Sequence, residues 1–348
     1  MATETPLLGF DIGSTAVRAC LLTGDERRPE LVVFDTLELQ PGTVVNGVIR
    51  DADAIVDALR ELVERNEVEG IPAAVAVPAS TSYLRRETLA PRRGRYDLRA
   101  AHAAVEEEIP PAWGEVSISV TPLSELDEDD VLIVAAPRLA VEALRATFGV
   151  AGIPLLCVDS ANCALYNAVA HAEGMESSAA VALVDIGAIE TRVVLLDGYA
   201  MVGSMRLPTG GAELTALLRR ELSLGYVEAE TYKIGGSDGS SDGVVPRDVQ
   251  DALERGCGEL AGQVATGLRG LCAAARVKRL EGVYLTGRSA ALSMLRSSMG
   301  AACGVRVRGI APFGAAEVDS NEFARDFLQA LEPSSAVAFG LALRRSGL

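Results

Sequence analysis

Histidine is scarce in this chain, which has only His102 and His171 among its 348 residues. Both lie in alanine-rich surroundings typical of helices, so neither a histidine-based catalytic triad nor a histidine-rich zinc site is expected. Cysteine is present but unorganised, because no C-x-x-C pair occurs. This scatter indicates buried free thiols and a reducing compartment rather than disulfides or a metal site; the six residues are Cys20, Cys157, Cys163, Cys257, Cys272 and Cys303.

Basic charge is also in deficit, and the formal net charge is -16. Nucleic-acid grooves and anionic membrane surfaces both reward lysine and arginine, so neither is expected as the main partner. No apolar run approaches the ~20 residues that a membrane-spanning helix needs. Residues 1–6 lack the basic and apolar parts of a signal peptide. We therefore expect a cytoplasmic protein without direct membrane insertion.

The first apolar segment of the chain predicts a tight hairpin. It stops at Asp11, Gly13 supplies a permissive backbone, and a second apolar run resumes after Thr15. Gly13, Ser14 and Thr15 can aim backbone N–H and hydroxyl groups at an anion, while Asp11 can hold a divalent cation through water. This is the pairing that a nucleotide with Mg²⁺ requires, although an isolated Asp-x-Gly is most often only a turn.

The hairpin pattern occurs a second time. Residues 184–196, V-D-I-G-A-I-E-T-R-V-V-L-L, align without gaps on residues 10–22 and repeat the Asp, Ile, Gly, Arg and Leu-Leu positions. Two hairpins of one design, far apart in the sequence, indicate two related halves that clamp one ligand between two turns. The repetition favours phosphate binding over a plain turn.

Strands and helices alternate along both halves, which predicts an α/β core. A strand at 153–158 leads through Asp159 into a helix, where Asp159 is either a cap or a functional carboxylate. Gly210 and Gly211 open another helix. Either the amides and the dipole at this helix start bind phosphate, or the two glycines only mark where the helix begins.

From Ser80 the character of the chain changes, and residues 81–150 are predicted to form an inserted subdomain. One strand is expected on each side of an acidic turn, S-E-L-D-E-D-D, at 124–130. Six arginines precede them in an otherwise acidic chain, and they either receive an acidic partner or form a solvated loop; they are Arg85, Arg86, Arg92, Arg93, Arg95 and Arg99.

The two D-I-G hairpins, the G-G helix start and a late T-G turn, in this order, resemble the phosphate-one, phosphate-two and adenosine motifs of the actin-like ATPase superfamily. Within it, the chain is similar to the PilM family of type IV pilus assembly proteins. The segments that carry this resemblance are G-F-D-I-G-S-T-A-V-R at 9–18, V-V-N-G-V-I-R-D at 44–51, the region 105–123, V-D-I-G-A-I-E-T at 184–191 and A-V-A-F-G-L-A-L-R at 336–344.

The resemblance implies an α/β, actin-like two-lobe fold built from two duplicated ribonuclease-H-like domains with an inserted FtsA-type 1C subdomain. The implied division is 1–80 with 151–175 as subdomain 1A, 81–150 as 1C, 176–215 with 281–348 as 2A, and 216–280 as 2B.

The implied function is an ATP-binding and Mg²⁺-binding scaffold with slow or no hydrolysis. It would bind the N-terminal cytoplasmic peptide of a PilN-like membrane protein in a groove that involves the inserted subdomain, and this partner would recruit it to the inner face of the cytoplasmic membrane. Self-association is a further option.

Carried over by position, Asp11 and Asp185 organise the metal and Asp159 takes a catalytic or water-orienting position. The implied nucleotide contacts are Asp11, Gly13, Ser14, Thr15, Asp185, Gly187, Thr191, Gly210, Gly211, Gly287 and Arg288. Arg288 departs from the family, whose adenosine turns usually carry consecutive glycines. It either obstructs the base or stacks on adenine or pairs with phosphate.

Two other functions remain open. Arg288 motivates a nucleotide-free scaffold similar to the cytoplasmic domain of type II secretion L-type proteins. A small-molecule kinase of the same superfamily would need a catalytic aspartate and a sugar pocket. An FtsA-like tethered filament is not favoured, since the chain ends at Leu348 without a basic amphipathic helix.

Overall fold

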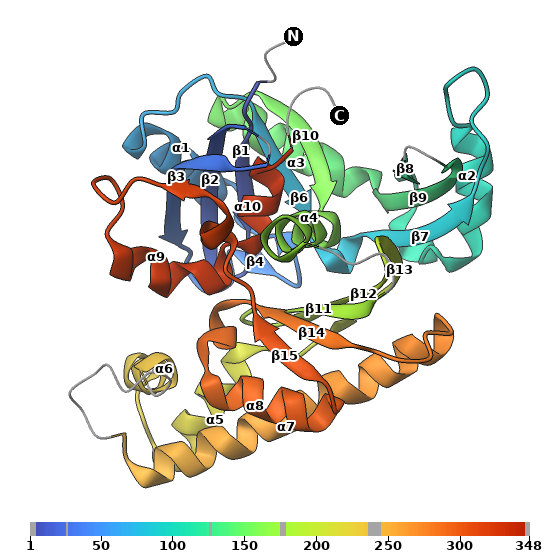
Figure 1. The fold of residues 1–348 in the computed structure, drawn as a ribbon. Helices are drawn as coiled ribbons and strands as arrows, with labels where there is room; N and C mark the ends of the chain where they lie inside the picture. The colour runs from blue at the N-terminus through green and yellow to red at the C-terminus, as the bar shows by residue number, and fades with distance from the viewer. Residues whose placement is uncertain (1–4, 26, 125–126, 175–178, 236–244, 345–348) are drawn as a thin grey trace.

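A computed structural model describes residues 5–25, 27–124, 127–174, 179–235 and 245–344. Two lobes lie one above the other (Figure 1). The sheet of the first lobe has the strand order β10-β6-β1-β2-β3-β16. Its strands are β1 (Leu8–Ile12), β2 (Ala16–Gly24), β3 (Pro29–Glu38), β6 (Ala73–Val77), β10 (Leu155–Ser160) and β16 (Glu317–Val318).

The sheet of the second lobe repeats this plan with the order β13-β12-β11-β14-β15. In both lobes three antiparallel strands are followed by two parallel ones. The duplication predicted from the two hairpins is therefore confirmed. The strands are β11 (Ala180–Ile186), β12 (Thr191–Asp197), β13 (Ala200–Leu207), β14 (Gly282–Thr286) and β15 (Arg306–Gly309).

Helices cover the outer face of each sheet. In the first lobe α1 (Ala52–Arg65), capped by Asp51, and α3 (Arg138–Ala151) pack on alternate residues of β1, including Phe10. In the second lobe four helices cover the sheet in the same way, and they pack on it through a larger apolar cluster. These helices are α5 (Gly211–Leu222), α6 (Tyr226–Gly235), α7 (Arg247–Ala274) and α8 (Ser293–Cys303). The glycine- and serine-rich segment that follows α6 lies outside the described residues.

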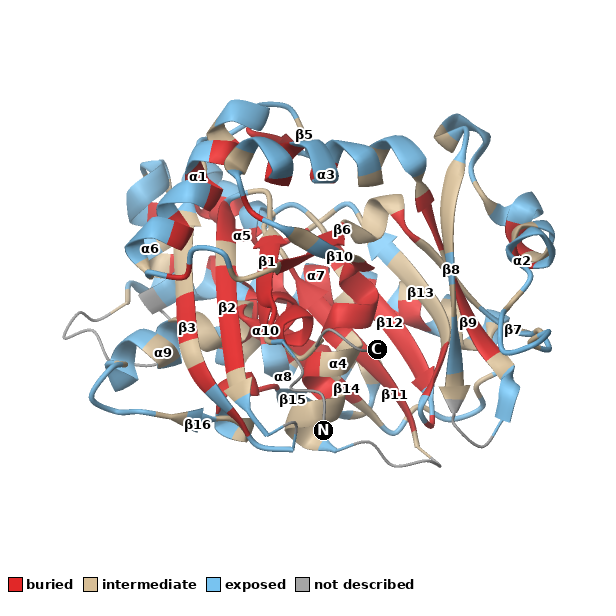
Figure 2. Cartoon of the chain, turned by 90° about the horizontal axis from the view of Figure 1, so that it is seen from above, coloured by how far each residue is buried: buried red, intermediate tan, exposed pale blue. Residues whose placement is uncertain are grey.

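Two helices lie between the sheets, α4 (Ala161–Glu173) and α10 (Ala336–Ala342), and both are buried at the centre of the molecule (Figure 2). A Cβ on Gly9 would overlap the carbonyl oxygen of Ala338, so α10 lies directly on β1. One apolar cluster joins Leu22 of the first sheet to Leu183 of the second through these helices. The inner faces of the two sheets therefore share a core.

The inserted segment forms a separate three-stranded sheet, β7-β9-β8. Its elements are β7 (Tyr83–Thr88), α2 (Leu98–Val105), β8 (Val116–Ser124) and β9 (Asp127–Pro137). The expected acidic turn is shorter than predicted, because Asp127 to Asp130 belong to β9. Pairing with β7 explains this, since Thr88 lies opposite Asp130. The remaining elements are a small hairpin of β4 (Val44–Val45) and β5 (Val48–Ile49), and α9 (Arg325–Leu331).

No helix among the described residues combines the length and apolar character required to cross a membrane.

Candidate functional site

The two Asp-x-Gly hairpins have the same backbone geometry. In the first, Asp11 lies opposite Arg18, and the Gly13 N–H donates to the Ala16 carbonyl at 2.9 Å. In the second, Asp185 lies opposite Arg192, and the Gly187 N–H closes the turn on the Glu190 carbonyl at 2.9 Å. Ser14 and Thr15 form the tip of the first turn, as predicted.

The aspartates of both hairpins lie on the inner faces of their sheets. Asp185 lies two residues after Leu183, and Asp11 lies two residues after Gly9. Residues two apart in a strand share one face, so both aspartates are on the side that faces α4 and α10 between the lobes;. Both carboxylates are largely buried, with exposed fractions of 8% for Asp11 and 6% for Asp185. The structure therefore turns the two predicted phosphate hairpins toward one another.

Each aspartate is paired with the arginine of its own hairpin. Arg18 Nη1 donates to Asp11 Oδ2 at 3.1 Å. Arg192 Nη2 lies 3.1 Å from Asp185 Oδ2. Burial raises the pKa of Asp185; Arg192 opposes this rise, and Asp11 of the other lobe adds to it. The hairpins are close enough to interact electrostatically, and the partner arginines are residues that the sequence analysis did not assign to the site.

The G-G helix start packs against the second hairpin. The N–H groups of Gly211 and Ala212 donate to the carbonyls of Gly187 and Ala188 at 2.9 and 2.8 Å. A Cβ on Gly210 would stand 2.5 Å from the Gly187 oxygen. These first helical amides are engaged, so they support the hairpin instead of offering donors to phosphate.

Thr191 also holds the second hairpin in place. Its side chain is fully buried, and Oγ1 donates to the Thr209 carbonyl at 2.8 Å. Thr191 therefore fixes the turn against the loop before α5.

The late T-G turn is tightly constrained at Gly287. Its φ is +93°, and a Cβ there would overlap the Ile186 carbonyl. Thr286 Oγ1 donates to the Pro333 carbonyl at 2.8 Å, and the Gly287 N–H donates to the same oxygen. The backbone of Ile186 therefore approaches position 287, where a glycine stands, and not position 288, where the arginine is exposed. A large side chain at position 288 is accommodated by the turn.

Two residues of α6 were missed by the sequence analysis. Lys233 has an exposed fraction of only 6%, and its Nζ lies 2.8 Å from Glu230 Oε1. Nζ also donates to Thr215 Oγ1 at 3.0 Å and to the Gly211 carbonyl at 3.3 Å. Burial lowers the pKa of Lys233, and Arg288 adds to the lowering. The signal was a Glu-x-x-Lys pair at helical spacing after the G-G helix.

Asp159 is not a helix cap. Ser160 caps α4, since its Oγ accepts from the Asn162 N–H at 3.2 Å. Asp159 Oδ1 accepts from the Ser160 N–H, and Oδ2 lies 2.6 Å from Arg344 Nε. The capping alternative is therefore wrong, because a serine one position later supplies the cap. Asp159 is committed to an ion pair at the end of α10.

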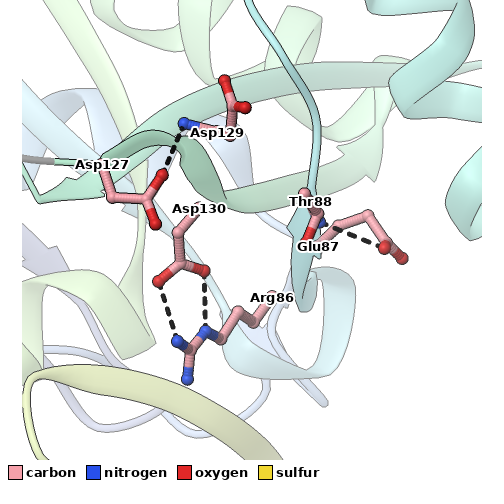
Figure 3. A pocket seen from close by; sticks show the side chains of 6 residues that line it. All are labelled: Arg86, Glu87, Thr88, Asp127, Asp129 and Asp130. Atoms are coloured by element: carbon pink, nitrogen blue, oxygen red, sulfur yellow. Dashed lines mark hydrogen bonds and ion pairs between the residues drawn. The ribbon is translucent and has the colours of Figure 1, made fainter.

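The arginine cluster is partly engaged within the inserted subdomain. Arg85 pairs with Glu108 and Glu87. Arg86 makes a two-bonded pair with Asp130, at 2.7 and 2.8 Å, beside a shallow acidic pocket of about 410 Å³ (Figure 3). Among the described residues, no group of three or more His, Cys, Asp or Glu side chains could hold a metal ion.

A second groove of about 650 Å³ lies between the inserted subdomain and the second lobe. It runs between β7 and β13, each of which pairs with only one strand within the described part of the chain. Leu84, Val202, Met205 and Leu271 give it an apolar lining. Two unpaired strand edges beside an apolar lining suit an extended peptide.

The chain is similar to known proteins in both sequence and fold. The sequence profile described as Type IV pilus assembly protein PilM matches residues 9–346. A solved PilM-PilN type IV pilus biogenesis complex is similar over 98% of both chains, with 26% identity and a TM-score of 0.80.

More distant structures share the fold alone. The ethanolamine utilization protein EutJ from Carboxydothermus hydrogenoformans is 18% identical, covers 97% of this chain and 89% of its own, and has a TM-score of 0.59. MreB5 of Spiroplasma citri bound to AMPPNP is 14% identical over 97% and 94%, with a TM-score of 0.53. With two duplicated sheets, two facing hairpins and a profile match over nearly its whole length, the chain belongs to the PilM family of type IV pilus assembly proteins.

Proposed function

We propose that this chain is an actin-like scaffold of the type IV pilus assembly platform that binds ATP between its lobes and a PilN-type membrane protein beside its inserted subdomain. ATP binding, the first part of this proposal, is supported by the facing pair of hairpins around Asp11 and Asp185. MreB5, which shares the fold, was solved with AMPPNP bound.

The phosphates would lie between the hairpins, where Gly13, Ser14 and Thr15 offer backbone and hydroxyl donors. Both ion pairs use Oδ2, so Oδ1 of Asp11 is the oxygen that suits Mg²⁺, which typically takes one or two carboxylates together with phosphate oxygens;. The base side would be formed by Gly287, Arg288 and the Glu230–Lys233 pair. When bound, the ion would neutralise phosphate charge.

Hydrolysis would be slow or absent. Asp159, the residue in the expected water-orienting position, is ion-paired with Arg344 and buried. A carboxylate held in this way is poorly placed to accept a proton from water. Nucleotide would instead act by changing how the lobes sit, and hence the affinity for the partner.

The partner's N-terminal peptide would occupy the groove between β7 and β13. Its rim charges are already neutralised, because Arg85 pairs with Glu108 and Arg206 with Glu190. An apolar, extended segment therefore fits it better than a charged one. Binding a membrane protein there would recruit the chain to the inner face of the cytoplasmic membrane.

We retain the four-part division 1–80 with 151–175, 81–150, 176–215 with 281–348, and 216–280 as the proposed subdomains. In this division the groove lies between subdomain 1C on one side and subdomains 2A and 2B on the other, so closure of the lobes would change its width. Self-association of the scaffold stays a proposal without a surface assigned to it.

The test is a calorimetric titration of the full chain with Mg-ATP and, separately, with the N-terminal peptide of its PilN-type protein. The proposal expects both to bind and each to alter the affinity for the other. Peptide binding without any ATP binding would instead establish a nucleotide-free scaffold.

A further inference from the structure

Arg206 on β13 belongs both to the groove between β7 and β13 and to the second Asp-x-Gly hairpin. Its side chain lines the groove, and 36% of that side chain is exposed. Its Nη1 donates to Glu190 Oε2 at 3.2 Å. Glu190 is part of the hairpin, since its carbonyl accepts the Gly187 N–H that closes the turn. One ion pair therefore joins the wall of the groove to the turn proposed to hold phosphate.

This pair lies beside a row of charged residues that crosses the second sheet. Strand register places Asp185 opposite Arg192 and Arg192 opposite Arg206. Like charges on directly opposed positions destabilise a strand pair, so the two arginines need carboxylates nearby. Burial works to lower the pKa of Arg192, but Asp185 and other carboxylates, Glu190 among them, outweigh it. Glu190 thus compensates the arginine of the hairpin as well as the arginine of the groove.

The first hairpin has the same turn without such a pair. When the two hairpins are aligned without gaps, Ala16 stands where the second has Glu190. Thr36 of β3 has the register position that Arg206 has in the second sheet. Even so, the Gly13 N–H closes the first turn at 2.9 Å, as in the second hairpin. The Glu190–Arg206 pair is therefore not required to form the hairpin, and it belongs to the lobe whose edge strand lines the groove.

We propose that the Glu190–Arg206 pair couples the nucleotide site to the peptide groove, an inference that rests on the two sites proposed above. An ion pair this exposed is worth little net free energy, so it opens and closes. When it is open, Arg206 presents an unpaired cation to an apolar groove, and Glu190 is an unpaired carboxylate at the phosphate turn. An apolar peptide disfavours the cation, and a polyphosphate repels the carboxylate. Both ligands therefore select the closed pair, and ATP tightens peptide binding.

The size of this coupling depends on how often the pair is closed in the free protein. When one ligand fixes the state that the other prefers, the affinity of the second rises at most by the reciprocal of the fraction already in that state. A pair that is closed in roughly a fifth to a half of the molecules gives a gain of about two- to fivefold.

The test is a calorimetric titration of the full chain with the N-terminal peptide of its PilN-type protein, with and without saturating Mg-ATP. Arg255→Gln is the control, since Arg255 is also an exposed arginine paired with a glutamate, Glu221, but does not line the groove. The native chain and the control should bind the peptide about two- to fivefold more tightly with ATP.

The two variants of the pair should lose this dependence on ATP at opposite ends. Arg206→Gln removes the cation from the groove, so in both conditions it should bind the peptide as tightly as the native chain does with ATP. Glu190→Gln leaves Arg206 without its partner, so in both conditions it should bind the peptide more weakly than the native chain does without ATP. A pair that only stabilised the fold would not shift peptide affinity in opposite directions.

Each other outcome overturns the inference in a recognisable way. Peptide affinity that ATP leaves unchanged or lowers in the native chain overturns the coupling and leaves both binding functions standing. Failure to bind ATP or the peptide overturns that part of the proposed function as well. Variants that shift in the same direction, or that keep the ATP effect, also contradict the inference. If thermal unfolding shows that a single variant is misfolded, the double variant Glu190→Ala with Arg206→Thr copies the first lobe, and it should bind the peptide tightly with or without ATP.

Discussion

Arg344, two residues after α10, has its Nε 2.6 Å from Asp159 Oδ2, which ties this end of the helix to the last residues of strand β10. Arg344 Nη1 also lies 3.9 Å from Cys157 Sγ on the same strand. Neither Asp159 Oδ2 nor Arg344 Nε completes a hydrogen bond despite the short ion contact. The contact is therefore an electrostatic tie between β10 and the segment that follows α10.

The pH dependence of stability should reveal this pair. Burial raises the pKa of Asp159 more than Arg344 lowers it. An acid whose folded pKa exceeds its unfolded value of about 3.9 contributes stability that is greatest below that value and is lost as the pH rises through the folded pKa. The Tm of the native chain minus that of Asp159→Asn should be larger at about pH 4, close to the unfolded pKa, than at about pH 7. A difference that is flat or grows with pH would contradict this assignment.

The crossing of α4 and α10 should tolerate no side chain at Gly340. A Cβ there would overlap the Ala164 carbonyl, and both helices are buried between the lobes. Gly340→Ala is expected to lower the free energy of unfolding by at least about 1–3 kcal/mol, the usual cost of overpacking. Urea titration measures this.

The control for that variant is Gly262→Ala in α7, where a Cβ meets nothing within 4 Å. It should raise stability by roughly 0.5–1 kcal/mol, because alanine is the better helix former. Equal effects at the two glycines would show that the helix crossing is not tightly packed.

Lys233 should serve both stability and nucleotide affinity. Lys233→Met leaves Glu230 half-buried without its cation, which should cost about 1–3 kcal/mol of stability;. The double variant with Glu230→Gln should recover most of that loss. ATP affinity should stay reduced in both variants. Recovery of affinity together with stability would mean that the pair is only structural.

Peptide binding should depend on the groove between β7 and β13. Ser204 lines the groove on β13, and Ser204→Glu would place a charge against its apolar lining. The affinity for the PilN-type peptide is expected to fall by about tenfold or more, by analogy with a charge buried at an interface centre. Tyr199→Glu, at an exposed site beside the same strand, is the control. Equal affinities for the two variants would exclude this groove.

Much of the fold followed from local pattern. The repeat of Asp11 at Asp185 predicted the duplicated halves, because a period-two strand and an Asp-x-Gly turn are local features. Thr191 and Gly210 were also found in the sequence, but their contacts were not. Hydrogen bonds from α5 to the second hairpin join residues 24 positions apart, and no local pattern encodes them.

The ion pairs were harder to predict than the turns. Arg18 and Arg192 were visible as repeated positions, yet their pairing with the aspartates depends on strand register. Asp159 was assigned to a cap or to catalysis because its partner, Arg344, lies 185 residues further along the chain. Such pairs follow only from tertiary packing.

The most direct measurement is a calorimetric titration of the native chain with ATP beside Arg288→Gly. Arg288 is exposed next to the constrained Gly287. Its charge contributes to lowering the pKa of both Glu230 and Lys233. We therefore predict micromolar binding by the native chain, and equal or weaker binding by Arg288→Gly, which loses a cation. No binding by the native chain, restored by Arg288→Gly, would contradict the account and establish a nucleotide-free scaffold.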